Sequence, residues 1–64
     1  MIRKGGVDQL ITAITEAADE AAALAALAGV SRATLEALAD QLYVDPYGRS
    51  SAVVRRAIVN EARA

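Results

Sequence analysis

The chain has 64 residues, which limits it to one domain and excludes a multidomain enzyme or a fold with a deep substrate cavity. It has no Cys and no His, so the disulfide and zinc sites that stabilise many small domains are excluded. The net charge of −1 and the 55% hydrophobic content argue against disorder and against tight, non-specific nucleic-acid binding.

The composition predicts an all-α fold with three helices. Sixteen residues are Ala, which has the highest helix propensity, and Val and Ile show no strict alternation. Four acidic residues interrupt the most apolar stretch, residues 7–28, so we expect no membrane span and no signal peptide. The lack of Cys is compatible with a reducing compartment, and we expect a cytoplasmic protein.

The first predicted helix covers residues 7–28, in which apolar residues recur in steps of four and three. This heptad-like spacing predicts a long amphipathic helix, although it leaves open a break near Asp19 and Glu20. Ordinary packing on the chain's own core explains such a stripe. The alternative is a homodimer interface, because small Ala side chains let helices approach closely. The expected interface residues are Val7, Ile11, Ile14, Ala18, Ala21 and Ala25.

A second helix is predicted from Ser31 to about Tyr43. Gly29 is a natural helix terminator, and Ser31 is a natural N-cap for the helix that follows. Four apolar residues of this segment fall on one face and are expected to contribute to the core: Leu35, Leu38, Ala39 and Leu42.

A turn and a third helix complete the chain. Asp45-Pro46-Tyr47-Gly48 has favoured residue types at the first, second and fourth positions of a type I turn. Ser50 or Ser51 is expected to cap the last helix, whose apolar stripe is Val54, Ala57, Ile58 and Ala62. The core of one chain is thin relative to the entropy cost of folding, which favours a homodimer.

Charge is distributed unevenly along the chain. Residues 46–64 contain four arginines against Glu61, a net charge of +3, whereas residues 1–28 have a net charge of −2. A locally basic end of this kind makes a few phosphate contacts even in an acidic protein. The adjacent Arg55 and Arg56 are expected either to form a solvated face or to join Arg49 in binding phosphate or an acidic protein.

Catalysis has little support in the sequence. General acid–base chemistry usually needs His or a carboxylate in a cleft, and the serines here are better explained as helix caps. Glu16, Asp19 and Glu20 are expected to form a solvated acidic face rather than a cation site. We therefore predict a protein that is not an enzyme, with no catalytic residues, no metal and no cofactor.

Residues 31–58 contain a motif in three parts. Leu35-x-x-Leu38-Ala39-x-x-Leu42-x-Val44 is followed by Gly48-Arg49-Ser50-Ser51 and then by Val54-x-x-Ala57-Ile58. This pattern resembles the helix–extended-loop–helix family, which includes SAP, LEM and HeH modules and the N-terminal domain of the transcription terminator Rho. The SAP members bind DNA, and the LEM members bind a DNA-associated protein. Ser51 stands where the family usually has Lys.

The resemblance implies DNA contacts in the loop and at the start of the last helix, at Gly48, Arg49, Ser50, Ser51 and Arg55. Tyr43 and Tyr47 flank the turn and are expected to cover the core beside Pro46, or else Tyr47 is an exposed contact for a base or a partner. With Tyr47 and Arg56 added, these residues form the candidate nucleic-acid surface.

A second segment, residues 21–38, has a weaker resemblance to a helix-turn-helix. Leu24-Ala25, Gly29-Val30-Ser31, Leu35 and Leu38 carry the pattern. The resemblance implies a recognition helix that starts with Arg32, Ala33, Thr34 and Ala37, although Glu36 and Asp40 on that helix would repel phosphate.

Two functions are consistent with these observations. The first is a small nucleic-acid-binding or transcription-related module that contacts DNA phosphates through the loop and the last helix. The alternative is a homodimeric protein-interaction or assembly module, in which the Ala-rich N-terminal helix binds a second copy or a larger protein partner.

Overall fold

The computed structural model describes residues 4–64, which form four α-helices and, within that range, no strand. The helices are α1 (Lys4–Glu16), α2 (Glu20–Ala26), α3 (Arg32–Gln41) and α4 (Ser51–Ala62). The all-α prediction is therefore confirmed, whereas the prediction of three helices is wrong. In the described range no helix combines the length and apolar character needed to cross a membrane.

The predicted helix over residues 7–28 is divided at residues 17–19, where the chain bends. Asp19 has an extended backbone (φ −155°, ψ −179°), and its carboxylate accepts a hydrogen bond from the Ala22 N–H at 2.8 Å. Asp is favoured at N-caps because its side chain satisfies an amide that has no partner in the first turn. A new helix therefore begins at Glu20.

The break changes which side of the chain faces the core. Ile14 of the predicted stripe is fully buried, and α2 buries Ala23, followed by its C-cap residue Leu27, instead of continuing that stripe. Three later members of the stripe are exposed: Ala18, Ala21 and Ala25. The heptad spacing mispredicts this face because the non-helical residues reset the helical phase between α1 and α2.

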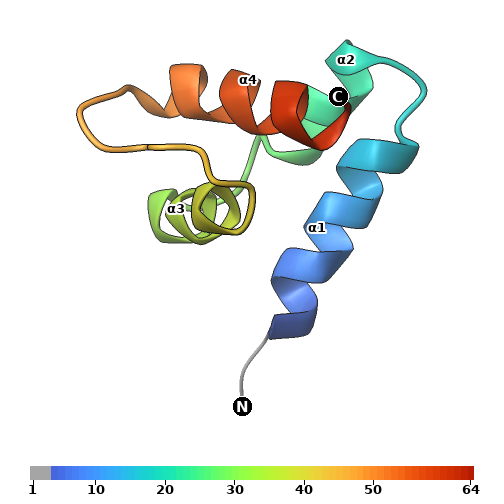
Figure 1. Cartoon of the computed structure of the whole chain (residues 1–64). Coiled ribbons are helices and arrows are strands. Elements are labelled where there is room, and N and C mark those ends of the chain that lie inside the picture. The colour runs from blue at the N-terminus through green and yellow to red at the C-terminus, as the bar shows by residue number, and fades with distance from the viewer. Residues whose placement is uncertain (1–3) are drawn as a thin grey trace.

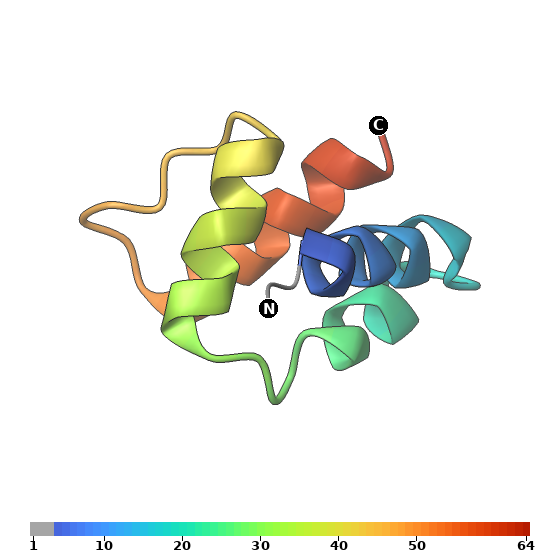
Figure 2. The same ribbon diagram turned by 90° about the horizontal axis from the view of Figure 1, so that it is seen from below.

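All four helices contribute to a single core. Helix α4 lies across α3 and also packs against α1 and α2, which lie together on the other side of the molecule (Figures 1 and 2). The predicted core face is confirmed at Leu35, Leu38, Ala39, Val54 and Ile58, whereas Leu42, Ala57 and Ala62 are only half-buried and Val59, which was not predicted, is buried. The buried apolar residues are Ile14, Ala23, Leu27, Leu35, Leu38, Ala39, Val54, Ile58 and Val59.

The helix ends are capped by local side chains. Ser31 Oγ accepts a hydrogen bond from the Thr34 N–H at 3.2 Å, and Ser50 Oγ accepts one from the Val53 N–H at 3.3 Å. Both serines were predicted as caps, and Ser50 rather than Ser51 caps α4. Between these helices, the loop of residues 42–50 projects on the side of the molecule away from α1 and α2 (Figures 1 and 2).

Arg63 joins the end of the last helix to the end of the first. Its Nη1 donates hydrogen bonds to the carbonyl oxygens of Ile14 at 3.0 Å and Ala17 at 2.9 Å. These carbonyls lie at the C-terminal end of α1, where unpaired acceptors and the helix dipole attract a cation. Arg63 is the C-cap residue of α4, and its side chain caps α1 as well.

Candidate nucleic-acid interface

The loop begins with a Schellman motif that ends α3. The Val44 N–H donates to the Ala39 carbonyl at 2.7 Å, and the Tyr43 N–H donates to the Asp40 carbonyl at 3.2 Å. Tyr43 has a positive φ of 59°, in the left-handed region where this motif usually has Gly. The motif turns the chain sharply away from α3 and leaves the Tyr43 side chain 97% exposed.

The loop then turns at Pro46, one residue later than predicted. The Arg49 N–H donates to the Pro46 carbonyl at 3.3 Å, which makes Gly48 the third residue of the turn, with a φ of 76°. The expected type I turn over residues 45–48 is wrong, because a positive φ at the third position is typical of a type II turn. Asp45 instead accepts a hydrogen bond from the Tyr47 N–H at 3.0 Å.

Arg32 holds this loop against both neighbouring helices. Its Nη2 donates to the Pro46 carbonyl at 2.7 Å, its Nη1 donates to Ser51 Oγ at 3.3 Å, and its Nε pairs with Glu36 at 3.1 Å. Sequence reasoning assigned Arg32 only to a recognition helix. Its role could not be read from spacing, because its partners lie in a loop and a helix that the fold brings to it.

Arg32–Glu36 is the only ion pair among the described side chains. Arg49 and Arg56 are exposed and Arg55 is half-buried, and none of the three has a carboxylate within ion-pair distance. Arg49 is the residue before the N-cap of α4, and Arg55 and Arg56 lie in the second turn of this helix. The three predicted cationic residues thus lie on one stretch of the chain, from the end of the loop to the second turn of α4.

Ser50 and Ser51, also predicted to contact nucleic acid, both accept hydrogen bonds within the protein. Ser50 Oγ caps α4, and Ser51 Oγ accepts from Arg32. Each hydroxyl keeps its own proton, which it can donate to a phosphate oxygen. Tyr47 and Gly48 complete the predicted set at the tip of the loop, where the Tyr47 side chain is 72% exposed. It therefore does not cover the core.

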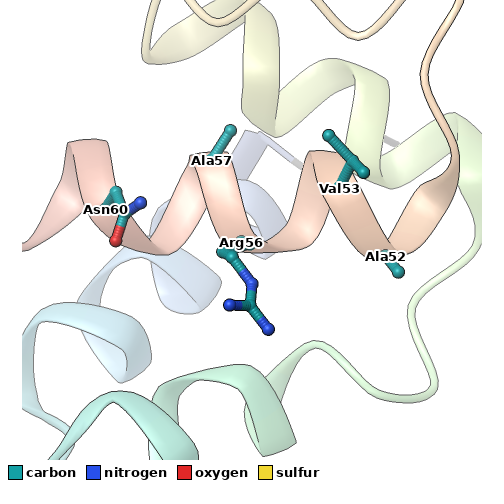
Figure 3. A pocket seen from close by; sticks show the side chains of 5 residues that line it. All are labelled: Ala52, Val53, Arg56, Ala57 and Asn60. Atoms are coloured by element: carbon teal, nitrogen blue, oxygen red, sulfur yellow. The ribbon is translucent and has the colours of Figure 1, made fainter.

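The outward face of α4 is an open apolar surface beside these residues. Figure 3 shows Arg56 extending to one side of the helix, whereas Val53 and Ala57 point to the other. With Ala52 and Asn60 they line a shallow hollow of about 440 Å³. Arg56 is the one cation on this face, so any phosphate contact there depends on it.

The break at Asp19 leaves α2 and α3 as separate helices on either side of residues 27–31. These two helices do not pack against each other, as the helices of a helix-turn-helix do. The side chains on α3 also do not favour nucleic acid. Arg32 is held by Glu36 and the loop, Ala33 and Ala37 present small apolar groups, and Glu36 and Asp40 are acidic. Arg32 is the only cation of α3, so this helix offers no unpaired positive charge to a phosphate.

The residues predicted for a dimer interface are divided between the core and the surface. Ile14 is fully buried within the chain itself, and Val7 and Ile11 are half-buried against the core. Only the alanines remain available to a second chain: Ala18, Ala21 and Ala25.

Two acidic residues at the α1–α2 junction stabilise the start of α2. Asp19 caps α2, and Glu20 lies in its first turn, where a negative charge is favourable. Across the described residues, no three side chains of the types that bind metals lie together.

No family model, no curated protein and no solved structure matches this chain.

Proposed function

We propose that this chain is a small, non-catalytic nucleic-acid-binding module that contacts phosphates through the loop and the start of α4. The observation that carries the proposal is the division of the arginines. Arg32 and Arg63 are held by hydrogen bonds within the fold, whereas Arg49, Arg55 and Arg56 have no carboxylate partner. The helix–extended-loop–helix resemblance implies contacts at the same segment.

The physical basis of this binding is electrostatic. Exposed guanidinium groups displace the counterions condensed on a nucleic acid, and the release of these ions drives association. The N–H groups and dipole at the start of α4 add a weaker attraction for phosphate. Because the chain as a whole is slightly acidic, we expect weak binding that depends strongly on salt.

The test is a titration of a fluorescently labelled DNA duplex with the protein, followed by anisotropy at several salt concentrations. If three arginines neutralise phosphates, the logarithm of the affinity falls with the logarithm of salt at a slope of about −2.7, or about 40-fold between ~50 and ~200 mM. The triple variant Arg49→Ala, Arg55→Ala, Arg56→Ala is expected to lose this binding and its salt dependence.

A matched control separates local contacts from net charge. The triple variant Gln9→Glu, Ala22→Glu, Gln41→Glu makes the same change in total charge, at exposed positions on α1, α2 and α3. It is expected to weaken binding much less than the arginine variant. Equal losses in the two variants, or no binding by the wild-type chain at low salt, would contradict the proposal.

Homodimeric assembly through α1 and α2 is the alternative proposal, and less of the structure supports it. The interface would rest on Ala18, Ala21 and Ala25, since Ile14 is already buried within the chain. If the chain assembles in this way, its helicity rises with protein concentration, and Ala21→Glu or Ala25→Glu reduces that helicity. Circular dichroism over a dilution series measures both effects.

A further inference from the structure

A second hollow, of about 300 Å³, lies between the C-terminal half of α3 and the loop that follows it. Val44 and Pro46 lie among its lining residues, and Pro46 is buried. Its other lining residues are two tyrosines, Tyr43 and Tyr47, and three acids, Glu36, Asp40 and Asp45. We call this set the tyrosine groove.

The two tyrosines present unusually open aromatic surface. Tyr43 is 97% exposed and Tyr47 is 72% exposed, although both are large side chains with apolar rings. They are the only aromatic residues of the chain. Two exposed rings beside one hollow indicate a contact surface rather than a contribution to the core.

The carboxylates decide which kind of group the tyrosine groove attracts. Glu36 is paired with Arg32, but Asp40 and Asp45 are exposed and have no cation within ion-pair distance among the side chains that the structure describes. Phosphate is repelled from such a site, so stacking of nucleotide bases on the tyrosines is disfavoured. A cation gains both from the carboxylates and from the negative faces of the aromatic rings.

We propose that the tyrosine groove binds an arginine side chain of a basic segment in a partner protein. The planar guanidinium group stacks flat on a ring and donates to a carboxylate at the same time, which the compact ammonium group of Lys does less well. Charge complementarity favours this occupant, and the groove contains none of the three arginines assigned to nucleic acid. The chain would thus have a basic surface and an acidic aromatic groove on the same loop.

Tyrosine fluorescence tests this inference directly in the whole chain. The protein has no Trp and both of its tyrosines line the groove, so its intrinsic emission reports this site alone. The probe is a short blocked peptide of alternating Arg and Gly. We expect a saturable change in emission, a weaker response to the Lys–Gly peptide, and no response to the Glu–Gly peptide.

Two variants locate the binding. Asp40→Asn with Asp45→Asn removes both unpaired charges and keeps an oxygen to accept from the Tyr47 N–H, and it is expected to raise the Kd about fivefold. Tyr43→Ala is expected to raise the Kd about two- to fivefold, and the emission of Tyr47 reports binding in this variant. The matched control, Asp8→Asn with Glu16→Gln, removes two exposed carboxylates from α1 and is expected to leave the Kd unchanged.

Three results would overturn the inference: no saturable change with the Arg–Gly peptide, an unchanged Kd in the double aspartate variant, or an emission change produced by a single-stranded oligonucleotide and enhanced in that variant. The last result would assign the rings to base stacking. The triple arginine variant is expected to bind the peptide normally, so this inference and the nucleic-acid proposal fail independently.

Discussion

Tyr43 adopts a left-handed backbone conformation at the end of α3, with a φ of 59°. For a residue with a Cβ atom this conformation costs about 1–2 kcal/mol, and Gly is the usual residue there. The ring is 97% exposed, so burial does not offset the cost. A residue that costs stability and gains no packing points to a contact outside the chain, which the peptide binding proposed for the tyrosine groove would supply.

Replacing Tyr43 with Gly is expected to stabilise the protein by about 0.5–1 kcal/mol, since Gly removes the steric cost but adds entropy to the unfolded chain. Urea denaturation measures the difference. Tyr43→Ala keeps the Cβ atom and is the control, which is expected to give no such gain. If the Ala variant were as stable as the Gly variant, the backbone explanation would be wrong.

The arginines show why residue type alone does not reveal function. Arg32, Arg55 and Arg63 are equivalent in composition, yet two of them make hydrogen bonds to carbonyl groups in other elements. Arg55 has no carboxylate partner. Which of them remains available to a ligand depends on neighbours that local spacing does not specify.

At the scale of elements, the N-terminal half of the chain forms two short helices. Helix α2 has 7 residues, fewer than an isolated helix needs to be stable in water. Its stability must come from the Asp19 cap and from the burial of Ala23 and Leu27. The junction at residues 17–19 is therefore where the fold depends most on one polar side chain.

Asp19→Ala is expected to lower the free energy of unfolding by about 1 kcal/mol, because the Ala22 N–H loses its acceptor. Asp19→Asn, which keeps an acceptor oxygen, is expected to change it by only a few tenths of a kcal/mol. Chemical denaturation distinguishes the two. A gain in stability and helicity in the Ala variant would mean that residues 7–28 prefer one continuous helix.

At the scale of the whole molecule, a small core is supplemented by polar contacts between distant segments. The buried residues are mostly aliphatic and come from all four helices. Arg63 adds a connection between residues 49 positions apart, from the end of α4 to the end of α1. In a small domain with marginal stability, one such contact contributes a large part of the net free energy of unfolding.

Arg63→Ala is expected to destabilise the protein by about 1–2 kcal/mol, because two carbonyl oxygens lose a charged donor. Arg56→Ala removes an equal charge from an exposed position without hydrogen bonds to the fold, and its effect is expected to be within about 0.5 kcal/mol. Thermal unfolding of both variants checks the comparison. Equal effects would show that Arg63 does not cap α1.

The sequence by itself determined the all-α class, the cap at Ser31, the cap of α4 as one of two serines, and most of the core face of residues 35–58. These features could be predicted because they depend on residues three or four positions apart, whose interactions helix geometry fixes. Asp19 carried a cap signal as well, but the uninterrupted apolar spacing around it favoured a single helix.

The tertiary structure alone decided the phase of α2, the roles of the arginines and the tyrosine groove. The contacts of Arg32 with Pro46 and Ser51 span 14 and 19 residues, and that of Arg63 with Ile14 spans 49. No local pattern encodes such distances, because they arise only when the helices pack. The candidate nucleic-acid residues were predicted from the chain, but which of their charges remain unpaired depends on that packing.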